Sequence, residues 1–210
     1  MIKPEFNTQD AKVISQEMLY SGHIKLMKFH FKFRLFKGGW SDEVVRECFL
    51  AKPAVGVLLF NPESDEIILI EQFRPGTYQT HSPSDSQHSP WLLELVAGLI
   101  ESNESIEDVA KRESMEEAGC EILDLVPIGE FFTSPGVSTG YFYLFCARIK
   151  QTHTGGLFGL DHEHEDIRAH VVTKQEAFEL LESGRIKNAP TIIALQWLQL
   201  NQQKIYSLWK

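Results

Sequence analysis

Apolar and polar residues alternate early in the chain, and this pattern predicts β-structure there. Across 29–35 every second residue is apolar and the residues between are His, Lys or Arg, as expected for a strand with one apolar face. The segment at 37–39 holds two glycines and predicts a turn, and residues 43–50 read as the return strand. Residues 1–50 are therefore predicted to form a small antiparallel β-rich domain.

The rest of the chain mixes short apolar runs with helical patterns. Runs of strand length lie at 54–60, 67–73, 91–96, 125–132, 141–149 and 169–173. Helices are predicted at 105–118 with Gly119 as C-cap, at 174–183 after a capping-box pattern, and from an N-cap at Asn188 onward. Polar segments rich in Pro, Ser, Gly or His predict loops at 75–90 and 151–166. Because strands and helices do not alternate regularly, residues 51–210 are predicted to form an α/β domain with a mixed sheet.

Composition and charge narrow the possible partners and the location. The 210 residues carry a formal net charge of −9 with no long basic run, which argues against binding to nucleic acid or to a membrane surface. The three cysteines form no CxxC pair, so no zinc site or disulfide framework is expected, and a reducing compartment fits best. The N-terminus has no apolar signal core, and no apolar run is long enough to span a bilayer. We therefore expect a cytoplasmic protein.

Three glutamates are expected to share one face of the helix at 105–118. Glu113, Glu116 and Glu117 stand at i, i+3 and i+4, the spacing that makes side chains neighbours. Converging carboxylates suit a hard divalent cation such as Mg²⁺, which prefers oxygen ligands and often bridges to phosphates. A solvated acidic face is the plainer interpretation of the same residues. Glu104 falls on the opposite side and is expected to anchor a basic residue such as Arg112.

The spacing of residues around this helix resembles the Nudix box, the signature of Nudix hydrolases. Its fixed charged and glycine positions are all present: Gly98, Glu104, Arg112, Glu113, Glu116, Glu117 and Gly119. Ser114 and Cys120 occupy positions that are apolar in the signature, and neither is a predicted metal ligand. The resemblance implies an α/β/α sandwich with a mixed sheet. It also implies hydrolysis of a nucleoside diphosphate linked to another moiety, with Mg²⁺ or Mn²⁺ as cofactor.

A longer resemblance, over nearly the whole chain, is to bacterial ADP-ribose pyrophosphatases. The matching segments lie at 46–47, 71–74, 93–98, 134–136, 165–168 and 193–198. Pro135, which stands 15 residues beyond Cys120, matches a proline that marks this branch of the family. The resemblance implies hydrolysis of ADP-ribose to AMP and ribose 5-phosphate. Two alternatives stay open, namely the same chemistry on another nucleotide sugar such as GDP-mannose, and a Nudix-fold module that senses a nucleotide without cleaving it.

The same resemblance implies a set of site residues. The carbonyl of Ala97 and the carboxylates of Glu113 and Glu117 would bind metal, with Glu116 in the same shell. The predicted substrate-binding residues are Arg46, Glu47, Arg74, Ser134 and His23. The arginines would bind the pyrophosphate, and His23 stands where related enzymes often carry an aromatic residue that stacks on adenine. The resemblance further implies a homodimer in which Arg46 or His23 reaches the metal site of the other subunit.

The general base is expected on the loop at 151–166. Three glycines at 155, 156 and 159 allow this loop to close over a substrate. Glu163 best matches the family position of the base, and Glu165 is the alternative or an added metal contact. Two competing interpretations of the segment are a transition-metal site of His162 and His164, and a solvated acidic loop.

Overall fold

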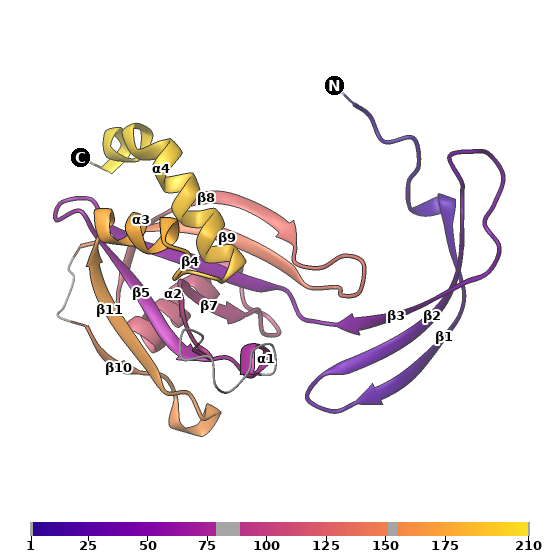
Figure 1. Cartoon of the computed structure of the whole chain (residues 1–210), viewed down its shortest axis with the longest axis horizontal. Coiled ribbons are helices and arrows are strands. Elements are labelled where there is room, and N and C mark those ends of the chain that lie inside the picture. The colour runs from indigo at the N-terminus through magenta and orange to yellow at the C-terminus, as the bar shows by residue number, and fades with distance from the viewer. Residues whose placement is uncertain (1, 79–88, 151–154, 210) are drawn as a thin grey trace. The chain divides into compact units, whose positions relative to one another are not determined.

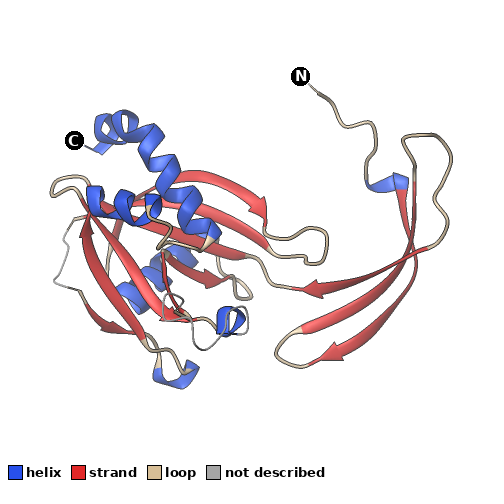
Figure 2. Cartoon of the chain, viewed as in Figure 1, coloured by secondary structure: helices blue, strands red, loops and turns tan. Residues whose placement is uncertain are grey.

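The computed structural model describes residues 2–78, 89–150 and 155–209. The chain divides into two compact units, Met1–Pro53 with Phe131–Tyr141 and Ala54–Glu130 with Phe142–Lys210. Much of the loop predicted at 75–90, and the beginning of the one predicted at 151–166, lie outside the described residues. Figure 1 labels the elements, and Figure 2 distinguishes the helices from the strands.

The N-terminal unit is built on a three-stranded antiparallel sheet in the order β1 (Ala11–Ser21), β2 (Lys25–Phe33), β3 (Val44–Leu50). The predicted alternating strand and its return strand are confirmed as β2 and β3. β1 was not predicted as a separate strand, because its apolar residues are adjacent, at 13–14 and at 18–20, rather than alternating. The register shifts at two places along β1, between Val13 and Ser15 and between Met18 and Tyr20, and each irregularity breaks the period of two.

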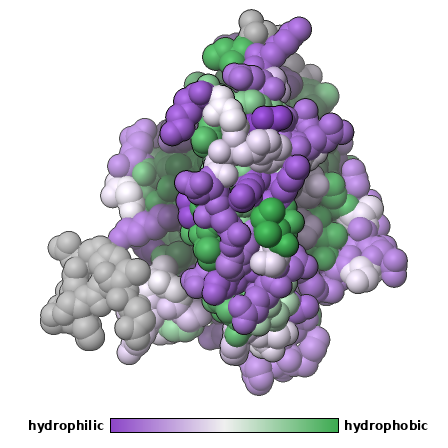
Figure 3. Space-filling model, turned by 90° about the vertical axis from the view of Figure 1, so that its right-hand side faces the viewer, coloured by the Kyte–Doolittle hydropathy of each residue, from purple (hydrophilic) through white to green (hydrophobic). Residues whose placement is uncertain are grey.

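Large apolar side chains of this unit reach the surface. All 11 residues of β1 are exposed, and Val13 and Tyr20 keep 53% and 56% of their accessible surface. The face drawn in Figure 3 carries hydrophobic patches between hydrophilic residues. A sheet of so few strands is marginally stable without a further packing surface.

The second unit contains a mixed sheet in the order β10-β11-β5-β4-β9-β8, with β6 paired to β5 and β7 paired to β4. Its strands are β4 (Ala54–Asn61), β5 (Glu66–Phe73), β6 (Trp91–Glu94), β7 (Val96–Leu99), β8 (Ile122–Phe132), β9 (Tyr141–Ile149), β10 (Gly156–Phe158) and β11 (Ile167–Thr173). β4 runs parallel to β9 and antiparallel to β5 and β7, so the predicted mixed sheet is confirmed.

α2 (Ile106–Ala118) covers one face of this sheet, and α3 (Lys174–Glu182) and α4 (Ala189–Trp209) cover the other (Figure 2). α1 (Pro75–Tyr78) is a single turn after β5, and η2 is a 3₁₀ turn at Asp161–Glu163. On one face, Val109 and Ala110 of α2 share an apolar core with Leu59 and Ile68. On the other, Tyr206 of α4 packs edge-on against Phe60. No helix of the described residues is long and apolar enough to cross a membrane.

The single strand predicted at 91–96 is in fact two strands that change partner at Leu95. β6 pairs with β5 and β7 pairs with β4. At the break, the Leu95 amide donates to Thr191 Oγ1 of α4 at 2.9 Å. The loop predicted at 151–166 likewise contains structure, the short strand β10 and the turn η2. β7 and β10 both lie next to α2.

Candidate active site

Helix α2 is capped at both ends. Ser105 and Asp108 form a capping box at its start, and Gly119 ends it in the left-handed conformation at φ 62°, as predicted for this glycine. The fixed ends set which side of the helix each glutamate occupies. Glu117 is buried at 2% exposure, while the Glu113 and Glu116 side chains keep 13% and 27%.

Two of these glutamates lie against the backbone of β7. The amide of Ala97 donates to Glu117 Oε2 at 2.9 Å. A Cβ built on Gly98 would lie 1.7 Å from Glu113 Oε1, so the carboxylate occupies space that only glycine leaves open. The sequence therefore brings the α2 carboxylates and the Ala97–Gly98 backbone together.

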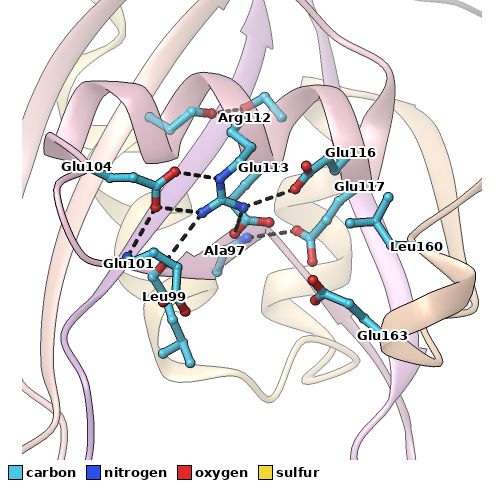
Figure 4. Close-up of polar contacts among 12 residues, drawn as sticks. Ala97, Leu99, Glu101, Glu104, Arg112, Glu113, Glu116, Glu117, Leu160 and Glu163 are labelled. Atoms are coloured by element: carbon cyan, nitrogen blue, oxygen red, sulfur yellow. Dashed lines mark hydrogen bonds and ion pairs between the residues drawn. The ribbon is translucent and has the colours of Figure 1, made fainter.

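Arg112 ties the outer part of the site together (Figure 4). Its guanidinium donates to both oxygens of Glu104 at 2.7 and 3.0 Å, which confirms the predicted anchoring role of Glu104. Its Nη1 also donates to Glu113 Oε1 at 2.6 Å and Glu116 Oε2 at 3.0 Å. Bonds to these carboxylates, with Glu104 foremost, raise the pKa of Arg112 above its ordinary value. Arg112 thus neutralises part of the acidic cluster.

Ionisation of the two inner carboxylates, Glu113 and Glu117, is unfavourable in the folded protein. Burial raises the pKa of Glu117 to about 8; the Ala97 amide opposes this rise, and repulsion from Glu113 and Glu165 adds to it. Burial likewise raises the pKa of Glu113, although the Arg112 bond opposes it. A cluster of oxygen donors with excess negative charge is the environment that a hard divalent cation stabilises.

Glu163 and Glu165 both lie at the η2 turn, beyond β10. Figure 4 shows the Glu163 side chain directed toward Glu117. Glu163 is half exposed, whereas the charge of Glu165 acts on both Glu113 and Glu117. A bond from the Gly159 amide to the Glu116 carbonyl, at 3.1 Å, joins this segment to α2.

The competing histidine site rests on an extended loop, and the structure does not have one there. His162 belongs to the 3₁₀ turn, and His164 follows it in the left-handed conformation at φ 57°. The alternation of side chains that an extended segment would give is therefore absent at this point of the described chain. The His162 ring approaches the Glu163 carboxylate at 3.7 Å, with both side chains largely exposed.

Arg74 also acts on this site. Its positive charge lowers the pKa of Glu117, although burial of Glu117 outweighs that effect. Arg74 Nε donates to Glu94 Oε2 at 2.7 Å, and the Glu94 side chain is only 4% exposed. Glu94 was not predicted as a site residue. A carboxylate inside the apolar run at 91–96 was the signal that could have identified it, because such groups are rarely buried without a partner.

The remaining predicted substrate residues belong to the N-terminal unit. Arg46 and Glu47 lie on β3, where Arg46 Nη1 donates to the carbonyl of Val45 at 2.8 Å. His23 lies in the exposed turn between β1 and β2. Ser134 begins the turn after β8, and its carbonyl accepts from the Val137 amide at 3.0 Å. Their roles remain predictions.

The carboxylates of Glu113, Glu116 and Glu117 have the chemistry of ligands for a divalent cation, but they do not converge on a single point. Across 2–78, 89–150 and 155–209, no three His, Cys, Asp or Glu side chains converge closely enough to hold a metal ion. Arg112 Nη1 occupies one oxygen of Glu113 and one oxygen of Glu116, so these two oxygens already have a cationic partner. Glu113 and Glu117 lie beside the β7 backbone, and their role as metal ligands stays a prediction.

Comparison with known proteins places the chain in a family. The NUDIX domain model matches residues 50–195. The chain is 42% identical over its full length to the full-length ADP-ribose pyrophosphatase of Escherichia coli (strain K12). It is 32% identical to the GDP-mannose pyrophosphatase of Yersinia enterocolitica, covering 90% of this chain and 94% of that protein. A crystal structure of an ADP compounds hydrolase has the same fold, with a TM-score of 0.70 over 95% of this chain and 98% of that one, at 19% identity. The chain belongs to the Nudix family.

Proposed function

We propose that this protein is a Mg²⁺-dependent pyrophosphatase that hydrolyses ADP-ribose to AMP and ribose 5-phosphate. The observation that carries the proposal is the pair of carboxylates, Glu113 and Glu117, held against the β7 backbone at Ala97 and Gly98. Full-length identity of 42% to the Escherichia coli ADP-ribose pyrophosphatase supports the choice of substrate. Mn²⁺ is an alternative cofactor for the same oxygen donors.

In the proposed reaction, water attacks one phosphorus and the bridging P–O bond breaks. Glu113, Glu117 and the carbonyl of Ala97 would hold a divalent cation, with Glu116 beside them. Such a cation would neutralise charge on the pyrophosphate and activate water. Glu163 accepts the proton of the attacking water, and Glu165 is the alternative base. Arg74, whose charge already acts on Glu117, binds the pyrophosphate.

We further propose that the active enzyme is a cytoplasmic homodimer. The exposed apolar residues of β1 give the small N-terminal sheet a surface that a second copy can cover. Arg46, Glu47 and His23 of this unit, together with Ser134, are then the remaining substrate-binding residues. His23 offers an imidazole for stacking on the base, with less area than Phe or Trp.

A GDP-mannose pyrophosphatase is the second candidate function, because a relative of that name is 32% identical over most of the chain. A non-catalytic nucleotide sensor is disfavoured, since the chain keeps every glutamate of the Nudix signature. The test is a comparison of kcat/KM for ADP-ribose, GDP-mannose and other nucleoside diphosphate sugars with Mg²⁺, read by phosphate release after a coupling phosphatase. ADP-ribose should give the highest value. A higher value for GDP-mannose would assign the second function.

A further inference from the structure

Arg74 is held from behind by a buried carboxylate. Arg74 Nε donates to Glu94 Oε2 at 2.7 Å, and Glu94 keeps 4% of its side-chain surface while Arg74 keeps 41%. Within the part of the chain that the structure describes, Glu94 is the only acceptor of the Arg74 side chain. Arginine has five N–H donors in a rigid planar fork, so fixing Nε sets the direction of the two terminal nitrogens.

Glu94 is in turn held by the start of helix α4. Asn188 Nδ2 donates to Glu94 Oε1 at 2.7 Å. The Oδ1 of the same Asn188 accepts from the Thr191 amide at 3.1 Å and from Thr191 Oγ1 at 2.9 Å, which confirms Asn188 as the N-cap. Thr191 Oγ1 also accepts from the amide of Leu95, the residue next to Glu94. The chain of bonds therefore closes on itself.

The residue type at 188 is informative. Ser, Thr and Asp also cap helices well, but only Asn combines a capping acceptor with a side-chain N–H donor. An Asp in this place would set a second carboxylate against Glu94. The pairing of an amide cap with a buried glutamate therefore serves more than the end of α4.

We infer that Glu94 and Asn188 are positioning residues for Arg74, and that they aim its terminal fork at the pyrophosphate of the substrate. The inference rests on the proposed substrate-binding role of Arg74. The charge of Arg74 already acts on Glu117, so the guanidinium lies within electrostatic reach of the carboxylate site. Preorganisation of this kind lowers the entropy lost when an anion is bound.

The test is a set of double-mutant cycles with ADP-ribose and Mg²⁺. Arg74→Ala should lower kcat/KM by about 10- to 100-fold, the range for losing bonds to a charged group. Glu94→Gln and Asn188→Ser should each lower kcat/KM by about 3- to 10-fold, mainly through KM. Neither should have a further effect in the Arg74→Ala background, because both act through Arg74. Asn188→Ser keeps a side-chain oxygen that can cap α4. It therefore provides the test if the Glu94→Gln protein, which is changed at a buried residue, fails to fold.

Thr173→Ala is the matched control. Thr173 Oγ1 caps α3 by accepting from the Glu176 amide at 3.1 Å, so this change removes a helix cap outside the chain of bonds. It should lower Tm and leave kcat/KM unchanged. A second measurement is independent of hydrolysis: the Arg74 Nε–H signal in ¹⁵N NMR, assigned by its loss in Arg74→Lys, should shift in Asn188→Ser and stay in place in Thr173→Ala.

Two results would overturn the inference. If Glu94→Gln and Asn188→Ser lower kcat/KM by the same factor with and without Arg74, they do not act through it. If Arg74→Ala leaves ADP-ribose hydrolysis unchanged although its Nε–H signal responds to Asn188→Ser, the bonds exist without a catalytic purpose. In that second case the proposed role of Arg74 also fails, whereas in the first it stands.

Discussion

Replacing Glu117 with Gln should stabilise the metal-free protein at high pH and abolish its activity. Glu117 is 2% exposed and its pKa is raised to about 8, chiefly by burial. The folded state therefore holds this proton to a higher pH than the unfolded chain does, and the free energy of unfolding falls as pH rises from about 4.5 to about 8. Gln carries no charge at any pH, and its side-chain oxygen can still accept from the Ala97 amide.

The size of the effect follows from the two pKa values. The pKa shift of Glu117 from 4.5 to about 8, at about 1.4 kcal/mol per pH unit, lowers the free energy of unfolding by about 2 kcal/mol at pH 6 and by about 4 kcal/mol at pH 8. The advantage of Glu117→Gln over wild type should therefore grow by about 2 kcal/mol between these two pH values. For a chain of this length the corresponding change in Tm is about 4–8 °C.

The assay is thermal and chemical unfolding at pH 6, 7 and 8, with EDTA and with saturating Mg²⁺. Mg²⁺ should raise the Tm of wild type more at pH 8 than at pH 6, because the cation competes with a proton at the lower pH. The Glu117→Gln protein should respond weakly to Mg²⁺ and lose orders of magnitude in kcat. Glu121→Gln is the control, because it removes the same charge at an exposed position just after α2. It should change neither the response of Tm to Mg²⁺ nor kcat.

Two outcomes would contradict the proposed role of Glu117. In one, the stability of the variant in EDTA changes with pH as much as that of wild type does. Burial of Glu117 would then not control the pH dependence of stability. In the other, the variant retains more than about a tenth of the wild-type activity, which a lost metal ligand would not allow.

Three further predictions test other parts of the site. Glu163→Gln should lower kcat strongly with little change in KM, because a general base acts in the transition state. If Glu165→Gln lowers kcat more, Glu165 is the base. Gly98→Ala should lower activity by about 100-fold, since its Cβ would lie 1.7 Å from Glu113 Oε1 and displace that carboxylate; normal activity with a normal Tm would contradict this. Mixing Arg46→Ala with Glu117→Gln under subunit exchange should restore part of the activity if sites are built across subunits. No recovery, with exchange verified by native mass spectrometry, would place each site within one chain.

Much of the fold could be predicted from periodicity, and the exceptions have physical causes. The alternation at 29–35 identified β2, and the apolar runs at 54–60 and 67–73 identified the β4–β5 hairpin. β1 escaped because two register shifts interrupt its period of two. The run at 91–96 concealed two strands, since a change of pairing partner at Leu95 leaves no mark on apolar spacing.

The site divides in the same way. Glu113 and Glu117 share a face of α2 at a separation of four residues, so local helix geometry was enough to group them. The bond from Arg74 to Glu94 spans 20 residues and that from Asn188 to Glu94 spans 94. Contacts over such separations depend on how sheet and helix meet, which no local pattern in a single sequence encodes. Asn188 was predicted only as a helix cap, and its second contact, the bond from Nδ2 to Glu94, was not predicted.

The most direct measurement of the central proposal is a product analysis. Purified protein is incubated with ADP-ribose and Mg²⁺, and the products are separated by ion-pair chromatography and identified by mass. AMP and ribose 5-phosphate should form in equal amounts. No product should form with EDTA until Mg²⁺ is added back, and none should form with Glu117→Gln. Absence of AMP from the wild type, or AMP formation that chelation and Glu117→Gln leave unchanged, would contradict the proposal.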